Sequence, residues 1–193
     1  MITRHLGRRM SCRAIKALGE RDVEGLFYSP HLALIARNNI ATIGFLTERI
    51  KGIEREVISE VALQDAFKKL LTIPGIGIIL GLTIMLEVGD INRFAKVGDY
   101  GSYCRCVRTQ RLSNDKNKGE GNRKNGNKYL SWAYVEASHH ALRTCPKANR
   151  FYQRKMAKTN GVVATKALSN KLARASYYVM RDHVAYDAQK LFG

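Results

Sequence analysis

The residues best suited to chemistry lie between positions 105 and 128, where cationic side chains surround a single serine. Only Asp115 and Glu120 oppose the positive charge there. A serine hydroxyl can attack phosphorus when positive groups hold a phosphate in line and stabilise the developing negative charge. Ser113 is therefore a candidate nucleophile, and the candidate phosphate contacts are Arg105, Arg108, Arg111, Lys116, Lys118, Arg123, Lys124 and Lys128. From the residues alone, a solvated loop without catalysis is the alternative interpretation.

The stretch from Gln110 to Lys128 has almost no apolar residue and is rich in Gly and Asn, so we expect a loop or a hairpin. A pliant cationic segment can follow a nucleic-acid backbone, and such binding weakens steeply with salt. No histidine lies near Ser113 in the sequence, because His139 and His140 come later on a predicted helix. The tyrosines that could attack phosphates instead are expected to serve as aromatic packing; they are Tyr100, Tyr103, Tyr129, Tyr177 and Tyr178.

A second candidate site is the run LTIPGIG at residues 71 to 77, which is predicted to join two helices. Gly75 and Gly77 can take positive φ and present bare N–H groups, and the helix that follows adds its positive dipole end. Together they would cup a phosphate without reading base sequence, while Ile73 and Ile76 plug the turn into the core. The alternative is a simple helix break within a bundle.

The carboxylates and cysteines give no sign of a metal site or a cofactor. Glu87, Asp90 and Asp99 come nearest to a group, but two-metal phosphoryl transfer needs several converging acids. Asp90 is expected to cap a helix instead. The four cysteines lack the spacing of a zinc site, so we expect free thiols in a cytosolic protein.

The fold class that the sequence predicts is mainly α, with a long amphipathic linker helix followed by a compact helical domain that carries a helix–hairpin–helix-like turn and a basic loop. We expect a poorly structured lead-in at 1–32, a long coiled-coil-like linker helix at 33–69 and the helical domain at 70–193. Apolar residues in the long helix recur at spacings of 3 and 4: Ile43, Leu46, Ile50, Ile53 and Val57. This stripe either packs on its own domain or pairs with another copy through residues 33–61.

The charge balance favours a polyanionic partner. The 193 residues include 33 Lys and Arg against 16 Asp and Glu, a net charge of +17, which indicates nucleic acid and, more rarely, an anionic membrane surface. The longest apolar run, Ile73 to Val88, is shorter than the ~20 residues of a membrane span. We therefore expect no membrane association and a cytoplasmic location.

Three ordered segments resemble the C-terminal region of the IS110/IS116/IS902 family of transposases. They are LLTIPGIG…LEVGDINRF, SYCRCV…RLSN…KGEGNRKNGNKYL and VVATKALSNKLARASYYVM, between Leu70 and Met180. In the family pattern a catalytic serine precedes a Gly-rich basic stretch that ends in Lys-x-Gly-Asn-x-x-Leu. Here the serine in that place is Ser113, and the stretch ends at Lys124 to Leu130.

The resemblance implies a DNA recombinase that mobilises an insertion sequence, in some members guided by a structured RNA. It also implies a coiled-coil segment that helps to assemble an oligomer, and an N-terminal RuvC-like domain whose carboxylates bind a divalent metal. That domain is expected to be missing here, since no strand-rich segment with spaced acids precedes Leu34. The alternatives are a nucleic-acid-binding module without catalysis and an inert truncated remnant.

Overall fold

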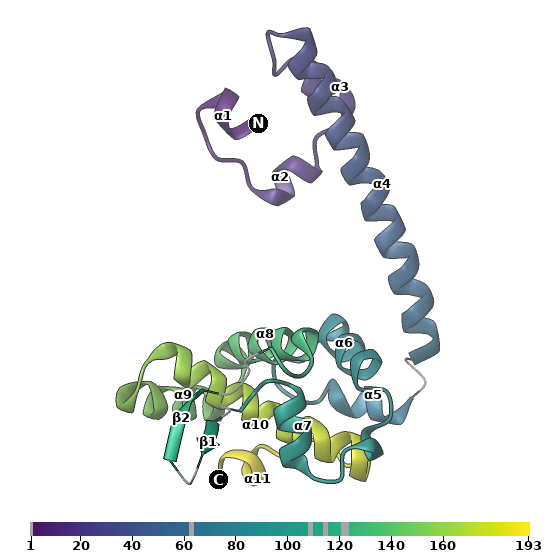
Figure 1. The fold of residues 1–193 in the computed structure, drawn as a ribbon. Coiled ribbons are helices and arrows are strands. Elements are labelled where there is room, and N and C mark those ends of the chain that lie inside the picture. Colours follow the sequence, from purple (N-terminus) through teal and green to yellow (C-terminus); the bar gives the residue numbers. More distant parts are fainter. Residues whose placement is uncertain (1, 62–63, 108–109, 114–115, 121–123) are drawn as a thin grey trace. The chain divides into compact units, whose positions relative to one another are not determined.

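The computed structural model describes residues 2–61, 64–107, 110–113, 116–120 and 124–193 (Figure 1). The fold is mainly α, as the sequence predicts. The chain divides into two units, Met1–Ser59 and Glu60–Gly193, and each unit has a hydrophobic core of its own.

The first unit is built on the beginning of one long helix. Three short helices, α1 (Ile2–Leu6), α2 (Cys12–Lys16) and α3 (Glu20–Glu24), precede α4 (Pro30–Val61). Pro30 occupies the first helical position, where its fixed φ suits the helix and its missing N–H costs nothing. The buried residues that join the short helices to α4 are Ile2, Val23, Phe27, Ala36 and Ile40.

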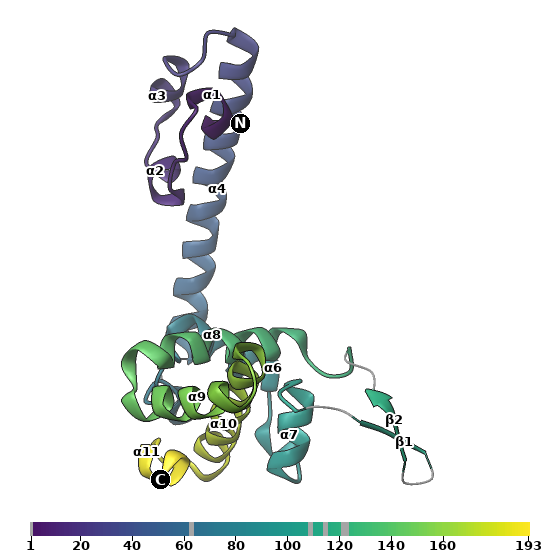
Figure 2. The same ribbon diagram turned by 90° about the vertical axis from the view of Figure 1, so that its left-hand side faces the viewer.

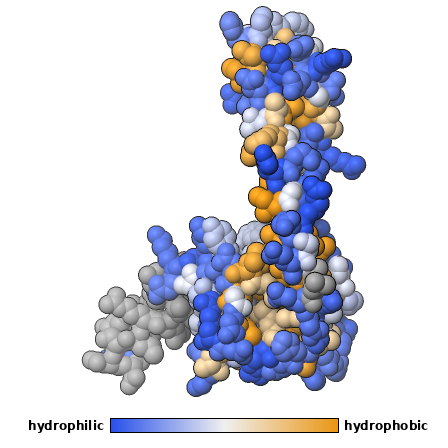
Figure 3. Space-filling model, turned by 90° about the vertical axis from the view of Figure 1, so that its right-hand side faces the viewer, coloured by the Kyte–Doolittle hydropathy of each residue, from blue (hydrophilic) through white to orange (hydrophobic). Residues whose placement is uncertain are grey.

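The predicted helix at 33–69 is divided in the structure. Helix α4 ends at Val61, Gln64 has an extended backbone, and α5 (Asp65–Leu70) begins after it within the second unit. Beyond the first core, α4 exposes apolar side chains between charged ones (Figure 3). Three members of the predicted stripe are more than half exposed: Leu46 at 51%, Ile50 at 53% and Ile53 at 65%.

The second unit contains the remaining elements (Figure 2). After α5 they are α6 (Ile78–Val88), the 3₁₀ turn η1 (Ile91–Arg93), α7 (Val97–Tyr103), β1 (Gln110–Ser113), β2 (Lys116–Glu120), α8 (Lys128–Thr144), α9 (Pro146–Lys158), α10 (Gly161–Asp182) and α11 (Ala188–Phe192). Asp90 caps η1 by accepting from the Asn92 N–H at 2.9 Å, as the sequence predicts. Pro146 ends the preceding helix and also starts α9 at its first position.

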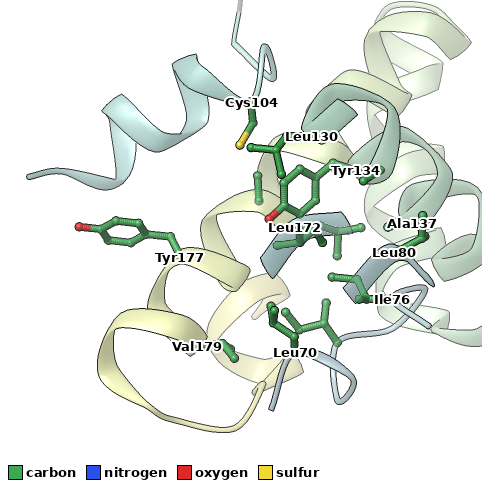
Figure 4. Close-up of a cluster of buried hydrophobic side chains, with 14 of the residues drawn as sticks. Leu70, Ile76, Leu80, Cys104, Leu130, Tyr134, Ala137, Leu172, Tyr177 and Val179 are labelled. Carbon is green, nitrogen blue, oxygen red and sulfur yellow. The ribbon is translucent and has the colours of Figure 1, made fainter. Parts of the chain in front are cut away.

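Helices α8 and α10 form the centre of this unit, and small side chains let them approach closely. The Ser138 and Ser169 hydroxyls are hydrogen-bonded across the two helices at 3.0 Å, and both residues are fully buried. Around this contact the core gathers side chains from α5, the α5–α6 turn, α6, α8 and α10 (Figure 4). The buried Tyr100 hydroxyl of α7 pairs with that of Tyr134 on α8 at 2.5 Å, so these two buried hydroxyls satisfy each other.

Candidate nucleic-acid interface

The turn between α5 and α6 is held by close backbone packing. Gly75 has φ +88°, and a Cβ added there would lie 2.0 Å from the carbonyl oxygen of Ala137 in α8. Ile73 and Ile76 are buried on either side of it, so the prediction that they plug the turn into the core is confirmed. Gly75 is thus required by contact with α8, because any side chain at this position would push the turn off the helix.

Gly77 differs from the expectation, because its φ is −91° rather than positive. It is exposed and no atom lies within 4 Å of an added Cβ. Gly77 is the N-cap of α6, no side chain caps this end, and its carbonyl accepts from the Gly81 N–H at 2.8 Å. The start of α6 borders a shallow pocket lined by residues 71–80 and His140, so the first amides of α6 face a space that an anion could enter.

The basic segment forms a two-stranded antiparallel hairpin, β1 and β2. Leu112 pairs with Asn117 and Ser113 with Lys116, and the register is irregular between Gln110 and Leu112. The backbone of Ser113 therefore lies at the last pair of the hairpin before its turn. Its side chain is outside what the structure describes. The same holds for the side chains of Arg111 and Lys118, whose backbones lie in β1 and β2.

The other predicted cations are distributed around the hairpin. Arg108 and Arg123 lie outside the described residues. Lys116 is exposed at the tip, and Lys124 is exposed where the chain leaves the hairpin. Lys128 is the first residue of α8, with its ammonium nitrogen 4.8 Å from the centre of the Tyr129 ring.

Two segments, 103–106 and 124–127, enter and leave the hairpin, and we call them the hairpin base. Arg105 joins them: its guanidinium donates to the Gly126 carbonyl at 2.7 and 3.1 Å and also to the Lys124 carbonyl. The backbone of Arg105 is left-handed, with φ 54°, which costs a residue with a side chain about 1–2 kcal/mol. Lys166 of α10 donates to the Arg105 carbonyl at 2.9 Å and so anchors the base to the core.

The KNGN motif supplies the other half of the hairpin base. Gly126 has φ +91°, and an added Cβ would lie 2.4 Å from the Tyr103 carbonyl oxygen. The Asn127 N–H donates to that same oxygen at 2.7 Å. Its side chain caps α8 by accepting from the N–H groups of Tyr129 and Leu130, and it donates to the Glu87 carboxylate at 2.5 Å. The residue types at Gly126 and Asn127 are therefore fixed by contacts at the base.

Two of the five candidate tyrosines are buried. Tyr100 and Tyr177 are buried in the core, as the sequence predicts, and burial raises the pKa of Tyr100 far above its usual value. Such a phenol keeps its proton at neutral pH and is a poor nucleophile. Tyr103 is different, because hydrogen bonds from Asn127 and Arg93 lower the pKa of its hydroxyl beside the hairpin base.

Comparison with known proteins identifies the region that contains this base. Residues 67–153 match the model of the family described as Transposase IS116/IS110/IS902 family. We call residues 67–153, which are similar to this family, the transposase region. The chain is also 27% identical over 154 residues to the transposase for insertion sequence element IS1328 from Yersinia enterocolitica, an alignment that covers 78% of this chain and 46% of that protein. The chain thus spans about half the length of that relative.

The transposase region includes most of α5, the α5–α6 turn, the hairpin and its base, and most of α9. The resemblance drawn from the sequence motifs is therefore confirmed. Within the described ranges, no three His, Cys, Asp or Glu side chains come together in a way that could hold a metal ion. No helix in the same ranges has the length and hydropathy of a membrane span.

One group of cations, which lies partly within and partly beyond residues 67–153, was not among the predicted contacts. Residues 137–181 contain ten Lys and Arg and no Asp or Glu. The exposed side chains Arg150, Arg154 and Lys158 of α9 belong to this acid-free stretch. In the sequence this group is marked by the absence of Asp and Glu over a long interval. It is easily overlooked, because its lysines and arginines are not clustered in one loop.

Proposed function

We propose that this chain is the DNA-binding portion of an insertion-sequence transposase, in which Ser113 attacks a DNA phosphodiester. The single observation that carries the proposal is the place of the Ser113 backbone within the transposase region. It sits at the last strand pair of a cation-rich hairpin whose two ends are tied to the helical core. A nucleophile needs a fixed approach to its target, and a tied base supplies that constraint.

In the proposed reaction the Ser113 oxygen bonds to phosphorus while one phosphorus–oxygen bond of the DNA strand breaks. The serine hydroxyl loses its proton and the departing sugar oxygen gains one. One phosphoester replaces another, so the reverse attack rejoins DNA without ATP. Cations such as Lys116 would stabilise the extra negative charge of the transition state.

The proposal places the metal chemistry of the reaction outside the described residues of this chain. A divalent cation held by carboxylates of a RuvC-like domain would neutralise charge on the reacting phosphate when bound. The residues of this chain would bind and orient the DNA, and Ser113 would make the covalent link. A guide RNA is a further proposed partner, since a cationic hairpin suits any phosphodiester backbone.

We further propose that the exposed stripe of α4 pairs with a second copy of the chain. Leu46, Ile50 and Ile53 are separated by spacings of 4 and 3, and each is more than half exposed. Burying such a stripe against a like helix removes apolar surface from water in a coiled-coil seam. A homo-oligomer built this way would bring two DNA-binding units to one insertion sequence.

A covalent-adduct assay tests the proposed function. Labelled element-end DNA is incubated with the chain, guide RNA and a RuvC-like partner domain, and then denatured to reveal protein–DNA adducts. We expect adduct with the wild type and with the remote control Ser59→Ala, and none with Ser113→Ala. Equal adduct from wild type and Ser113→Ala would refute the serine proposal. Binding without any adduct would indicate a non-catalytic module, and no binding an inert remnant.

A further inference from the structure

Helix α9 carries a continuous basic face that the hairpin proposal does not use. Lys147, Arg150, Arg154 and Lys158 follow one another at spacings of 3, 4 and 4, which places them on one side of a helix. Arg150, Arg154 and Lys158 are exposed, and Lys147 is partly exposed and donates to the Gln189 side chain. In the described part of the chain no carboxylate forms an ion pair with these four residues, which we call the α9 basic face.

Other residues of α9 are firmly anchored, so the basic face is a fixed surface. Ala148 is 1% exposed within the core, and the Asn149 side chain donates to the Leu142 carbonyl at 3.1 Å. The Phe151 ring packs against Phe192 of α11, with their centroids 5.8 Å apart. A helix held in this way presents its cations at constant spacing, and little backbone entropy is lost when a ligand binds.

Further cations from α10 add to the same region. The Lys171 ammonium lies 5.1 Å from the centre of the Phe151 ring and donates to the Leu191 carbonyl at 2.5 Å. Partial burial, followed by repulsion from Arg174 and Arg154, lowers the pKa of Lys171. These charges repel one another, and a bound polyanion would relieve that repulsion.

The surface beside the basic face is concave. A cavity of about 490 Å³ is lined by Lys147, Asn149, Arg150, Gln153, Arg154, Phe192 and Gly193. Guanidinium, ammonium and amide groups are the donors that phosphate oxygens accept from. In Figure 2, α9 lies on the side of the unit away from the hairpin. A ligand bound at α9 would therefore make a contact separate from that of the hairpin.

We propose that the α9 basic face binds the phosphodiester backbone of duplex DNA, as a contact separate from the hairpin. This rests on the proposed function in one respect, that DNA is the substrate. From Lys147 to Lys158 the helix rises about 16 Å, a length of duplex that carries roughly ten phosphate charges. Single strands bind through aromatic stacking platforms, but Phe151 and Tyr152 of α9 are half-buried against the core, so the face suits an intact duplex.

The test compares two variants that remove the same charge. R150Q/R154Q/K158Q neutralises the α9 basic face, and R8Q/R9Q/K16Q neutralises three exposed cations of the first unit. The affinity of each for a non-specific duplex DNA is measured from 50 to 200 mM salt, and circular dichroism verifies folding. The slope of log affinity against log salt is negative, and each lost phosphate contact reduces its magnitude by about 0.9. We expect a decrease of about 2.7 for the α9 variant and little change for the control.

With this change in slope, the wild-type affinity falls about 40-fold more than that of the α9 variant over the same salt range. An unchanged slope, an equal change in the control, or a loss seen only with duplex RNA or single-stranded DNA would overturn the inference. The readout is binding alone, so a failed Ser113 adduct assay leaves it intact. If the wild type binds no DNA at all, both this inference and the proposed function fail.

Discussion

Replacing Gly75 by alanine tests whether the α5–α6 turn is fixed by backbone packing against α8. The added Cβ would lie 2.0 Å from the Ala137 oxygen and 2.8 Å from the Ala141 nitrogen. Both are backbone atoms of a buried helix and cannot rotate away. The positive φ costs about 1–2 kcal/mol and overpacking roughly 1–3 kcal/mol more. We therefore expect the free energy of unfolding of the second unit to fall by about 2–5 kcal/mol.

Denaturant unfolding followed by tryptophan fluorescence measures this loss, because the only tryptophan, Trp132, lies on α8 within the same unit. Gly77→Ala is the matched control: its φ is −91° and no atom lies within 4 Å of its added Cβ. A change at this N-cap is expected to stay within about 1 kcal/mol. If Gly75→Ala unfolds at the same denaturant concentration as the wild type, or if both variants lose equal stability, the packing argument is wrong.

Three further outcomes are expected. Arg105→Ala should loosen the hairpin base, so proteolysis within residues 107–125 becomes faster while the unfolding midpoint of the helices changes little; unchanged cleavage would count against the base contacts. In the native chain a thiol reagent should label Cys12 rapidly and the three buried cysteines only on unfolding. Burial raises the pKa of the Cys106 thiol to about 11, above the unfolded thiol pKa of about 8.5. The protonated thiol therefore contributes to stability below the unfolded pKa, and this contribution declines as pH rises towards 11. Ile50→Glu should shift the chain from oligomer to monomer in sedimentation, whereas a species of unchanged mass would contradict pairing through α4.

Much of the helical architecture follows from local patterns in the sequence. Asp90 was predicted to cap a helix and caps η1, and Ile73 and Ile76 were predicted to enter the core and are buried there. These predictions succeed because capping and burial of apolar side chains depend on residue types close by in the chain. The division of the long helix after Val61 was missed, because the extended conformation of Gln64 is not evident from the pattern around it.

The site was predicted less completely, because its decisive contacts join residues that are far apart in the sequence. Glycine at 75 indicated a turn, but only the structure reveals the Ala137 oxygen that excludes a side chain there. Arg105 was predicted as a phosphate contact, yet its guanidinium bonds to carbonyl oxygens about twenty residues away. Charge alone does not distinguish a cation that binds a ligand from one that satisfies the backbone.

The hairpin combines a fixed base with strands of polar, cation-rich sequence, and this combination would suit the proposed covalent attack on DNA. In-line displacement requires the nucleophile to be positioned closely, whereas binding a polyanion of any base sequence favours a surface that adapts to it. Arg105, Gly126 and Asn127 hold the two ends of the hairpin within hydrogen-bond distance of each other. The base thus limits how far the backbone of Ser113 can move from the core. Loosening the base should therefore lower the rate of adduct formation more than DNA affinity, and an equal loss of both would contradict this division of roles.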